Sequence, residues 1–458
     1  MNEHWAGVLL AALRRAVTIH RLYGPRHPLV GESCAAVAEA AAPPAGEARR
    51  CVLTLIDGAL YLDRWLLPAV SLAFDGFLQA LQDHQIESLT FCPPVEAGDV
   101  AHLVAALSGD KPAGGTPGGT ILVNEAPWTR EQLQDWENAP SRSAYASSLH
   151  ALRSLGLAVQ KGEHLDMSQA ANAVGSLLDL CVREPASALL LSTMKSHHEY
   201  TFYHSVNTCI LALAMGRLAG LGDPDLVLLG MGAMLHDIGK LGVSPAVLQH
   251  PGRLSPEQRW EIEQHPLIGA EAILSASEPG QEVVATVALE HHARYDGTGY
   301  PVLPYVGKPP GGGSDGPPLH LYSRLVAVAD AYDALTSRRS YRRAEAPPRA
   351  LHVLLDGMGR AWDPDAVLAF IHLMGVHPPG SLLRLRDGRV VTVTGPAQSP
   401  GASPPAVVVI DAAGRRRSEP EPVVFDPDDV VDLLTPGQVD VQPAALLAGT
   451  ALLPSPTG

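Results

Sequence analysis

The heptapeptide Met234-Leu235-His236-Asp237-Ile238-Gly239-Lys240 decides how the rest of the chain is interpreted. In it, a histidine directly followed by an aspartate closes an apolar run that has helical spacing. Further isolated histidines precede and follow it along the chain. Because imidazole and carboxylate groups are typical ligands of divalent metals, this pattern predicts several side chains converging on a metal site.

Seven side chains share this setting, since each lies near an end of a helix that the apolar spacing predicts. They are His204, His236, Asp237, His265, His291, His292 and Asp330. Nitrogen and oxygen donors suit first-row divalent ions such as Fe, Mn or Zn, and the absence of cysteine from the set disfavours a closed structural zinc site. We therefore expect an open site that serves catalysis or substrate binding.

The expected cofactors are two divalent ions that hold and deprotonate a water. Neighbouring residues on a helix point about 100° apart, so His291 and His292 are not expected to chelate one ion together. Asp237 could bridge two ions about 3.5–4 Å apart through its two carboxylate oxygens, as in two-metal hydrolytic sites. Asp330 and Asp333 lie three residues apart and share a helical face, so one can bind metal while the other orients a ligand or an arginine.

Composition limits the classes of partner. The formal net charge of -15 argues against DNA, RNA or anionic membranes, which clustered Lys and Arg would have to neutralise. The cysteines form no CxxC pair, so reduced buried thiols are favoured over a zinc or disulfide framework. The chain begins without the features of a secretion signal, and no apolar run reaches membrane-spanning length, so we expect a cytoplasmic protein.

Periodicity and punctuation predict a mainly α protein in five parts. Helical spacing runs with breaks through the centre, and alternation with period two follows Gly380. The expected parts are an α+β regulatory or interaction module at 1–108, a linker at 109–142, an all-helical domain at 143–376, a small β unit at 377–435 and a frayed tail at 436–458.

Within the flanking parts, apolar runs and turn residues predict individual elements. Expected helices cover 5–23, 29–41 and 71–84 and begin near 99, and expected strands cover 51–56, 59–65, 86–91, 382–385, 390–394 and 406–410. Asp57-Gly58 is expected to form a tight hairpin turn, because both residues tolerate positive φ.

The segment from about Glu199 to Phe370 resembles the HD-GYP family of the HD metal-dependent phosphohydrolase superfamily. The motifs that carry the resemblance are Tyr203–Asn207, Leu235–Gly242, Gln264–Ala270, His291–Pro301 and Val328–Ser337 with Arg339. The resemblance implies an all-helical HD-type domain that hydrolyses the bacterial signalling molecule cyclic di-GMP to pGpG, and in some members on to GMP. It also implies a site with iron or manganese and a metal-activated bridging water.

By position, the seven side chains named above match the family's metal ligands. Asp237 and Lys240 are the implied catalytic residues, with Lys240 beside the metal-bound phosphate. Asp333, Arg339 and Arg342 match positions that support the ligands or contact phosphate. The implied GYP loop, which would face the substrate or a protein partner, holds Gly299, Tyr300 and Pro301. A purely structural turn at this loop remains an alternative.

Departures from the family pattern keep other readings open. Ala293 stands where the family often has glutamate, and Tyr200 stands where trinuclear members have one, although Glu199 is adjacent; two ions are therefore favoured over three. One alternative is a weak or inactive signalling protein that binds nucleotide or a partner, and another is an HD phosphohydrolase of a different nucleotide. A homodimer, and a protein partner at the GYP loop or the N-terminal module, are the further partner hypotheses.

Overall fold

The structure is a computed structural model of the whole chain. It describes residues 3–42, 50–56, 59–63, 65–109, 119–126, 140–194, 200–248, 250, 252–276, 279–303, 318–337, 344–397, 402–439, 441 and 443. The chain divides into two compact units, Met1–Ala139 with Pro456–Gly458 and Pro140–Ser455.

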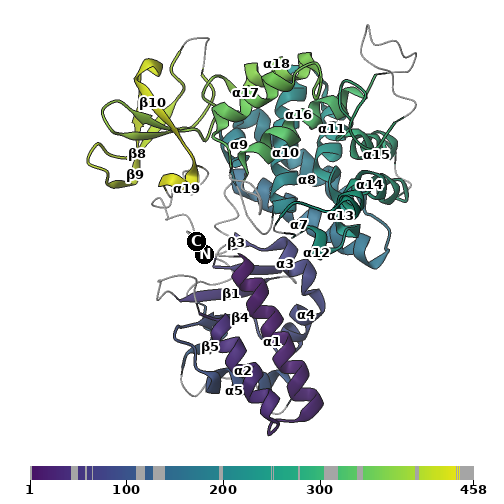
Figure 1. Cartoon of the computed structure of the whole chain (residues 1–458), viewed down its shortest axis with the longest axis vertical. Helices are drawn as coiled ribbons and strands as arrows, with labels where there is room; N and C mark the ends of the chain where they lie inside the picture. Colours follow the sequence, from purple (N-terminus) through teal and green to yellow (C-terminus); the bar gives the residue numbers. More distant parts are fainter. Residues whose placement is uncertain are drawn as a thin grey trace. The chain divides into compact units, whose positions relative to one another are not determined.

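The first unit combines an antiparallel sheet with helices (Figure 1). Its strands, in the spatial order β3-β2-β1-β4-β5, are β1 Cys51–Ile56, β2 Ala59–Leu62, β3 Trp65–Leu66, β4 Ser88–Phe91 and β5 Ile121–Val123. Its helices are α1 Glu3–Tyr23, α2 Pro28–Ala40, α3 Pro68–Ala73, α4 Asp75–Asp83 and α5 Ala97–Leu107. The register pairs Ile56 with Ala59, so β1 and β2 form the expected hairpin. The expected turn, Asp57-Gly58, lies outside the described residues.

The core of this unit lies between one face of the sheet and α1, α2 and α5. Alternate residues of β1, such as Leu53 and Leu55, share one buried apolar cluster with Leu9 and Leu13 of α1. This alternation follows from the two-residue side-chain period of a strand. The strand β5 falls inside the range 109–142 that was expected to be a linker, and it pairs with β4.

The helix expected over 71–84 is instead two helices that meet at Phe74. Phe74 has φ -118° and ψ 15°, outside the helical region, and its N–H donates to the carbonyl of Val70. Asp75 then opens α4, where a carboxylate in the first turn complements the positive end of the helix dipole.

Helices dominate the second unit. They are α7 Pro140–Lys161, α8 Met167–Arg183, α9 Pro185–Leu191, α10 Tyr200–Leu218, α11 Asp223–Leu235, α12 Pro245–Leu248, α13 Pro256–Glu263, α14 His265–Leu274, α15 Gln281–Glu290, α16 Leu321–Thr336, α17 Pro347–Gly357 and α18 Pro364–Met374, with a 3-10 turn η1 at Ile238–Gly242. In Figure 1, α10 and α11 lie among the others, and they pack on each other and on α8, α15 and α16. A helix buried on all sides is typical of such a central position. Polar residues are rarely fully buried without a partner, so the buried His204 and Asn207 of α10 are candidates for a functional or structural polar contact.

Three polar contacts fix α16, the helix that carries Asp330. The Tyr322 hydroxyl donates to Asp225 at 2.7 Å, and Arg324 donates to Asp363 at 2.5 Å. The buried Glu290 accepts a hydrogen bond from the backbone N–H of His320, just before the helix begins, at 2.9 Å. These contacts tie α16 to α11, α18 and α15 respectively.

A five-stranded antiparallel sheet follows the helices, with the spatial order β10-β6-β7-β8-β9. Its strands are β6 Leu382–Leu385, β7 Val390–Val393, β8 Ala406–Ile410, β9 Arg416–Val423 and β10 Val430–Leu434. The first three coincide with expected strands, whereas β9 and β10 were not expected. A 3-10 turn η2 at Pro427–Asp429 and a short helix α19 at Pro436–Val439 complete the described elements. Most of the range 436–458, expected to be frayed, lies outside the described residues.

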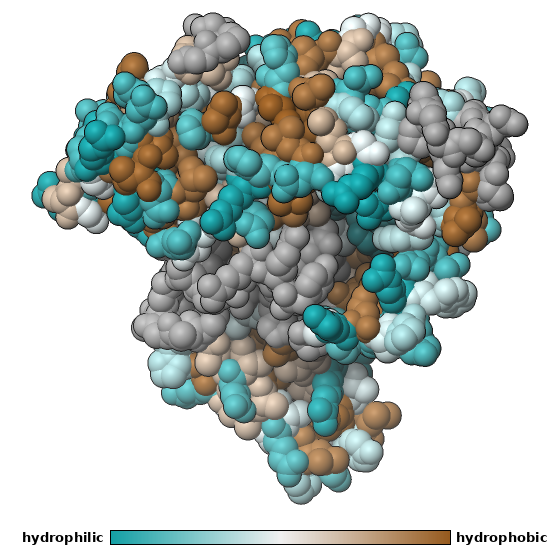
Figure 2. Space-filling model, turned by 45° about the horizontal axis from the view of Figure 1, so that its top comes forward, coloured by the Kyte–Doolittle hydropathy of each residue, from teal (hydrophilic) through white to brown (hydrophobic). Residues whose placement is uncertain are grey.

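The surface mixes polar and apolar side chains. Figure 2 shows apolar residues scattered among polar ones on the face in view. Among the described residues, no helix combines the length and the apolar character that crossing a membrane requires.

Candidate metal centre

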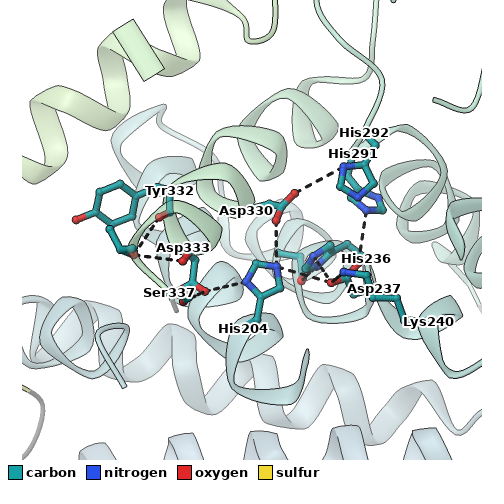
Figure 3. A network of polar contacts seen from close by, with 12 residues as sticks. His204, His236, Asp237, Lys240, His291, His292, Asp330, Tyr332, Asp333 and Ser337 are labelled. Atoms are coloured by element: carbon teal, nitrogen blue, oxygen red, sulfur yellow. Dashed lines mark hydrogen bonds and ion pairs between the residues drawn. The ribbon is translucent and has the colours of Figure 1, made fainter. Parts of the chain in front are cut away.

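The second unit brings all seven expected ligand residues to one place. Figure 3 labels each of them except His265. Six of the seven are buried and His292 is half-buried. The elements that supply them are α10 for His204, the end of α11 for His236 and Asp237, the start of α14 for His265, the end of α15 for His291 and His292, and α16 for Asp330. Residues far apart in the sequence therefore meet in one place. Most of them lie near helix ends, as expected, whereas Asp330 lies in the interior of α16.

Three of the histidines are held in the same way, by a backbone carbonyl three residues earlier. The Nδ1 atoms of His236, His265 and His291 lie 2.7, 2.7 and 2.8 Å from the carbonyl oxygens of Ala233, Ile262 and Ala288. Because a carbonyl oxygen can only accept, each Nδ1 carries the proton and, in the neutral ring, each Nε2 carries a lone pair. This is the tautomer that binds metal through Nε2.

These lone pairs converge on one another. Nε2 of His265 lies 3.2 Å from Nε2 of His291 and 3.2 Å from Oδ1 of Asp237. No proton lies on either nitrogen in this tautomer, so the three atoms face each other as acceptors. Among the described residues, the buried Nε2 of His236 and Oδ1 of Asp237 also have no hydrogen-bonding partner. Buried acceptors that converge without a donor are costly unless a cation lies between them, so the donor set fits bound metal ions.

Asp237 is shared between two groups of potential ligands. Its Oδ1 faces His265 at 3.2 Å and His291 at 3.7 Å, whereas its Oδ2 faces His236 at 3.4 Å and His204 at 3.7 Å. The ligand atoms within each group lie within 4.8 Å of one another. Such an arrangement of one carboxylate between two donor groups is what a pair of bridged ions requires.

Asp330, on α16, also faces both groups of potential ligands. One of its oxygens lies 3.0 Å from Nε2 of His204, and the other lies 4.0 Å from Nδ1 of His292. His292 belongs to the same potential ligand group as His291, with ring centroids 4.1 Å apart. The 100° separation expected between these two neighbours does not apply, because α15 ends at Glu290 and His292 lies beyond the helix.

Asp333 and Lys240 contact the ligands directly. Nδ1 of His204 donates to Asp333 at 2.8 Å, so this carboxylate orients the ring with Nε2 directed at Asp330. Figure 3 shows Asp333 and Asp330 on opposite sides of the imidazole. Ser337 lies 3.4 Å from the same Asp333 oxygen. Lys240 donates to Oδ2 of Asp237 at 2.5 Å, and its side chain is 16% exposed, so the ammonium group reaches both the ligands and solvent.

The protonation states of Asp237, His291 and His292 match the needs of a metal site. Burial alone would raise the pKa of Asp237, but the nearby Lys240 and His236 hold that pKa well below its usual range. Burial lowers the pKa of His291 to about 4, and burial together with the neighbouring His291 lowers the pKa of His292 well below its usual range. For His204, burial lowers the pKa but Asp330 and Asp333 outweigh it, so the pKa is raised. Charged carboxylates beside neutral imidazoles are the ligand forms of these groups, so a metal ion at His204 would have to displace a proton that the two carboxylates favour.

The expected GYP loop lies against the ligand histidines. Gly299 has φ 96°, and a Cβ there would lie 2.5 Å from the carbonyl oxygen of His292, so glycine is required by both conformation and space. Tyr300 places its ring 4.6 Å from the ring of His292. Pro301 follows it in the chain. Of the other expected substrate contacts, Arg339 and Arg342 lie outside the described residues.

Sequence reasoning missed two kinds of supporting group. The carbonyls that orient the histidines belong to the backbone, so no residue type could have revealed them. Glu290 was also missed; it is 4% exposed and ties the start of α16 to the end of α15, next to His291. An acidic residue at the apolar end of a helix, directly before paired histidines, was the available signal.

Comparison with known proteins finds the same domain. Residues 189–366 match the family model described as HD domain. The chain is 33% identical over 287 residues to "Cyclic di-GMP phosphodiesterase PA4108" of Pseudomonas aeruginosa, a match that covers 61% of this chain and 63% of that protein. It is 38% identical over 152 residues to "Cyclic di-GMP phosphodiesterase response regulator RpfG" of Xanthomonas campestris pv. campestris, covering 33% and 38% of the two chains.

A third relative bears a different substrate name. The chain is 34% identical over 179 residues to "3'3'-cGAMP-specific phosphodiesterase 3" of Vibrio cholerae, which covers 39% of this chain and 36% of that protein. The chain thus spans less than two thirds of the length of each of these relatives. Residues 189–366 thus match an HD domain, as the resemblance of this segment to the HD-GYP family predicted.

Proposed function

We propose that this chain is a metal-dependent phosphodiesterase that hydrolyses cyclic di-GMP to pGpG, with GMP as a further product. The observation that carries the proposal is the position of Asp237, whose two carboxylate oxygens face two separate groups of histidines. The names of the relatives supply the substrate, which the site geometry alone does not identify.

Two divalent ions, with iron or manganese as the proposed metals, would supply a water nucleophile and polarise the phosphate when bound. The chain's own residues hold these ions and keep their ligands in the correct tautomer. Asp333 keeps one proton of His204 on Nδ1, so Nε2 is the nitrogen whose lone pair would bind an ion once any proton there is displaced. Helix carbonyls do the same for His236, His265 and His291.

Lys240 is the proposed group that stabilises the phosphate. Its ammonium already lies 2.5 Å from Asp237 and is partly open to solvent, so a small movement of its flexible stem brings it to a phosphate oxygen bound beside the ligands. A positive charge fixed next to the developing negative charge lowers the barrier to phosphoryl transfer.

Tyr300 is proposed as a substrate contact of the GYP loop. Its ring lies 4.6 Å from that of His292 and 6.2 Å from that of His265, at the edge of the ligand cluster. Burial raises the pKa of its hydroxyl, and the negative charges of Asp237 and Asp330 raise it further, so the phenol stays protonated and can donate to an anionic substrate.

The test uses the full chain purified without oxygen and loaded separately with Fe(II) and Mn(II). Cyclic di-GMP and 3'3'-cGAMP are supplied in parallel, products are separated by chromatography, and bound metal is measured by elemental analysis. We expect metal-dependent formation of pGpG or GMP from cyclic di-GMP. Faster turnover of 3'3'-cGAMP would instead identify the other dinucleotide as the substrate.

The key variant is Asp237→Ala, with Asp179→Ala as the matched control, because Asp179 is an exposed carboxylate on α8 outside the cluster. Asp237→Ala should lose both metal and turnover, while Asp179→Ala should keep both. Wild-type turnover in Asp237→Ala would refute the proposed site. Metal and nucleotide bound without any hydrolysis would favour the inactive signalling protein.

A further inference from the structure

The first unit contains a groove that lies outside the metal centre. It has a volume of about 330 Å³ and is formed by one stripe of α1, by α3 and α4, and by the end of α5. Its residues on α1 are Arg14, Val17, Thr18 and Arg21, which recur at the spacing of a single helical face. The volume falls in the range of small-molecule sites, roughly 300–1,000 Å³.

The charge of this groove is opposite to that of the chain. Two arginines and no acidic residue line it, although the whole chain has a formal net charge of -15. In the described part of the chain, neither Arg14 nor Arg21 forms an ion pair with a carboxylate, whereas Arg259, Arg324 and Arg389 do. Among the residues that the structure describes, no carboxylate therefore lines the groove or pairs with its two arginines.

Both guanidinium groups are held in place at the rim. Arg14 lies over the ring of Phe74, 4.9 Å from its centroid, in a cation–π contact. Arg21 donates to the carbonyl oxygen of Leu107, the last residue of α5, at 2.6 Å. A guanidinium has five N–H donors, so most donors of each arginine remain for a ligand. Preorganised cations of this kind lose little freedom when an anion binds.

The floor of the groove is apolar. Val17 is buried, and Phe74 and Phe77 are half-buried and pack against the core of the unit. Arg14 and Arg21 are seven residues apart, which separates them by about 10 Å along the helix axis. The two arginines therefore lie toward opposite ends of the stripe, and a ligand that satisfies the groove has an apolar body with an anionic group at one end or at both.

We propose that this groove binds a small organic anion, a carboxylate or phosphate ester with an apolar body. Such a ligand would place its body on Phe74 and Phe77 and its charge on the guanidinium groups. The volume is suited to a single small molecule, since a docked helix needs a groove that extends over several turns.

The first experiment titrates the full chain with 8-anilinonaphthalene-1-sulfonate, an aromatic anion whose fluorescence rises in an apolar site. We expect saturable binding that weakens at least about tenfold in Arg14→Gln and in Arg21→Gln, because each loses a charge-assisted hydrogen bond. Arg15→Gln is the matched control, since Arg15 is the exposed neighbour on the same helix but does not line the groove. Decanoate and phenyl phosphate are then added as competitors to show which anionic group is preferred.

A second variant tests the groove without removing charge. Ala80 lines the groove on α4 and is partly exposed, so Ala80→Phe should fill the space and reduce binding to the same extent. Circular dichroism confirms that each variant is folded. Equal affinity of the wild type, Arg14→Gln, Arg21→Gln and Ala80→Phe, or the same loss in Arg15→Gln, would overturn the proposal.

Discussion

Gly239→Ala should disrupt the candidate metal centre although Gly239 is not itself an expected ligand. Gly239 lies in η1, between Asp237 and Lys240, and η1 packs against α14. A Cβ at this position would lie 2.0 Å from the carbonyl oxygen of His265 and 2.5 Å from the backbone nitrogen of Gly269. Both are backbone atoms, so no side-chain rotation can relieve the overlap.

The size of the effect follows from these distances. A Cβ essentially never approaches another heavy atom within 3.0 Å, so the start of α14 must move away from η1 by about 1 Å. The same movement separates His265 from Asp237, whose facing atoms are now 3.2 Å apart. Metal–ligand distances tolerate only about 0.2 Å of deviation, so we expect His265 to be lost as a ligand. Overpacking of this kind costs about 1–3 kcal/mol of stability, and a misplacement of about 1 Å costs on the order of 10²-fold in rate.

The assay compares Gly239→Ala with Gly242→Ala in metal content, urea unfolding and cyclic di-GMP turnover. Gly242 is the matched control in the same turn, because its added Cβ would meet the side chain of Ile268 at 3.1 Å, and a side-chain end can move. We expect sub-stoichiometric metal and reduced turnover in Gly239→Ala alone. If both variants retain full metal and equal turnover, the tight contact between η1 and α14 does not position the ligands.

Three further predictions concern single side chains of the centre. In metal-free protein, the free energy of unfolding should fall as pH drops from about 6.5 toward 4, because His291 has a pKa of about 4 when folded and 6.5 when unfolded, so the unfolded chain binds the extra proton. Urea titrations in EDTA measure this slope, which should flatten in His291→Gln. Asp333→Asn removes the carboxylate that orients His204, so competition with a chelator should show metal affinity reduced about 10–100-fold; unchanged affinity would contradict that role. Lys240→Met should keep its metal but lose about 10²–10³-fold in kcat, and a variant with normal kcat would exclude Lys240 from the reaction.

The side chains of the candidate metal centre could be chosen from sequence because most of them lie near helix ends, Asp330 in the interior of α16 being the exception. The apolar run before His236 ends where α11 ends, at Leu235. The paired histidines begin directly after Glu290, the last residue of α15. The sharing of His291 and His292 within one ligand group could not be predicted, since it depends on where the backbone leaves the helix. Because α15 ends at Glu290, directly before this pair, the angle of about 100° expected between the two side chains does not apply.

The missed strands have a physical explanation as well. The strands β9 and β10 are the two edges of their sheet. The sequence of β9, Arg416–Val423, contains prolines and charged residues and lacks apolar alternation. Edge strands tolerate proline because one row of backbone donors needs no partner, so their pairing is decided by the neighbouring strand rather than by their own pattern. The central strands β6, β7 and β8 carry the apolar pattern and were predicted.

The ends of three helices explain why this arrangement of histidines favours cations. The carbonyls that hold His236, His265 and His291 lie in the last turns of α11, α13 and α15, where helix carbonyls have no partner within the helix. Each histidine thus satisfies an otherwise unpaired acceptor and gains a fixed tautomer by doing so. The same three helix ends carry partial negative charge, about half an elementary charge each. They bring it close to the charged Asp237, so the backbone adds to the preference for positive ions that this side chain creates. Folding the helices to these ends therefore builds the ligand geometry and its electrostatic preference in one step.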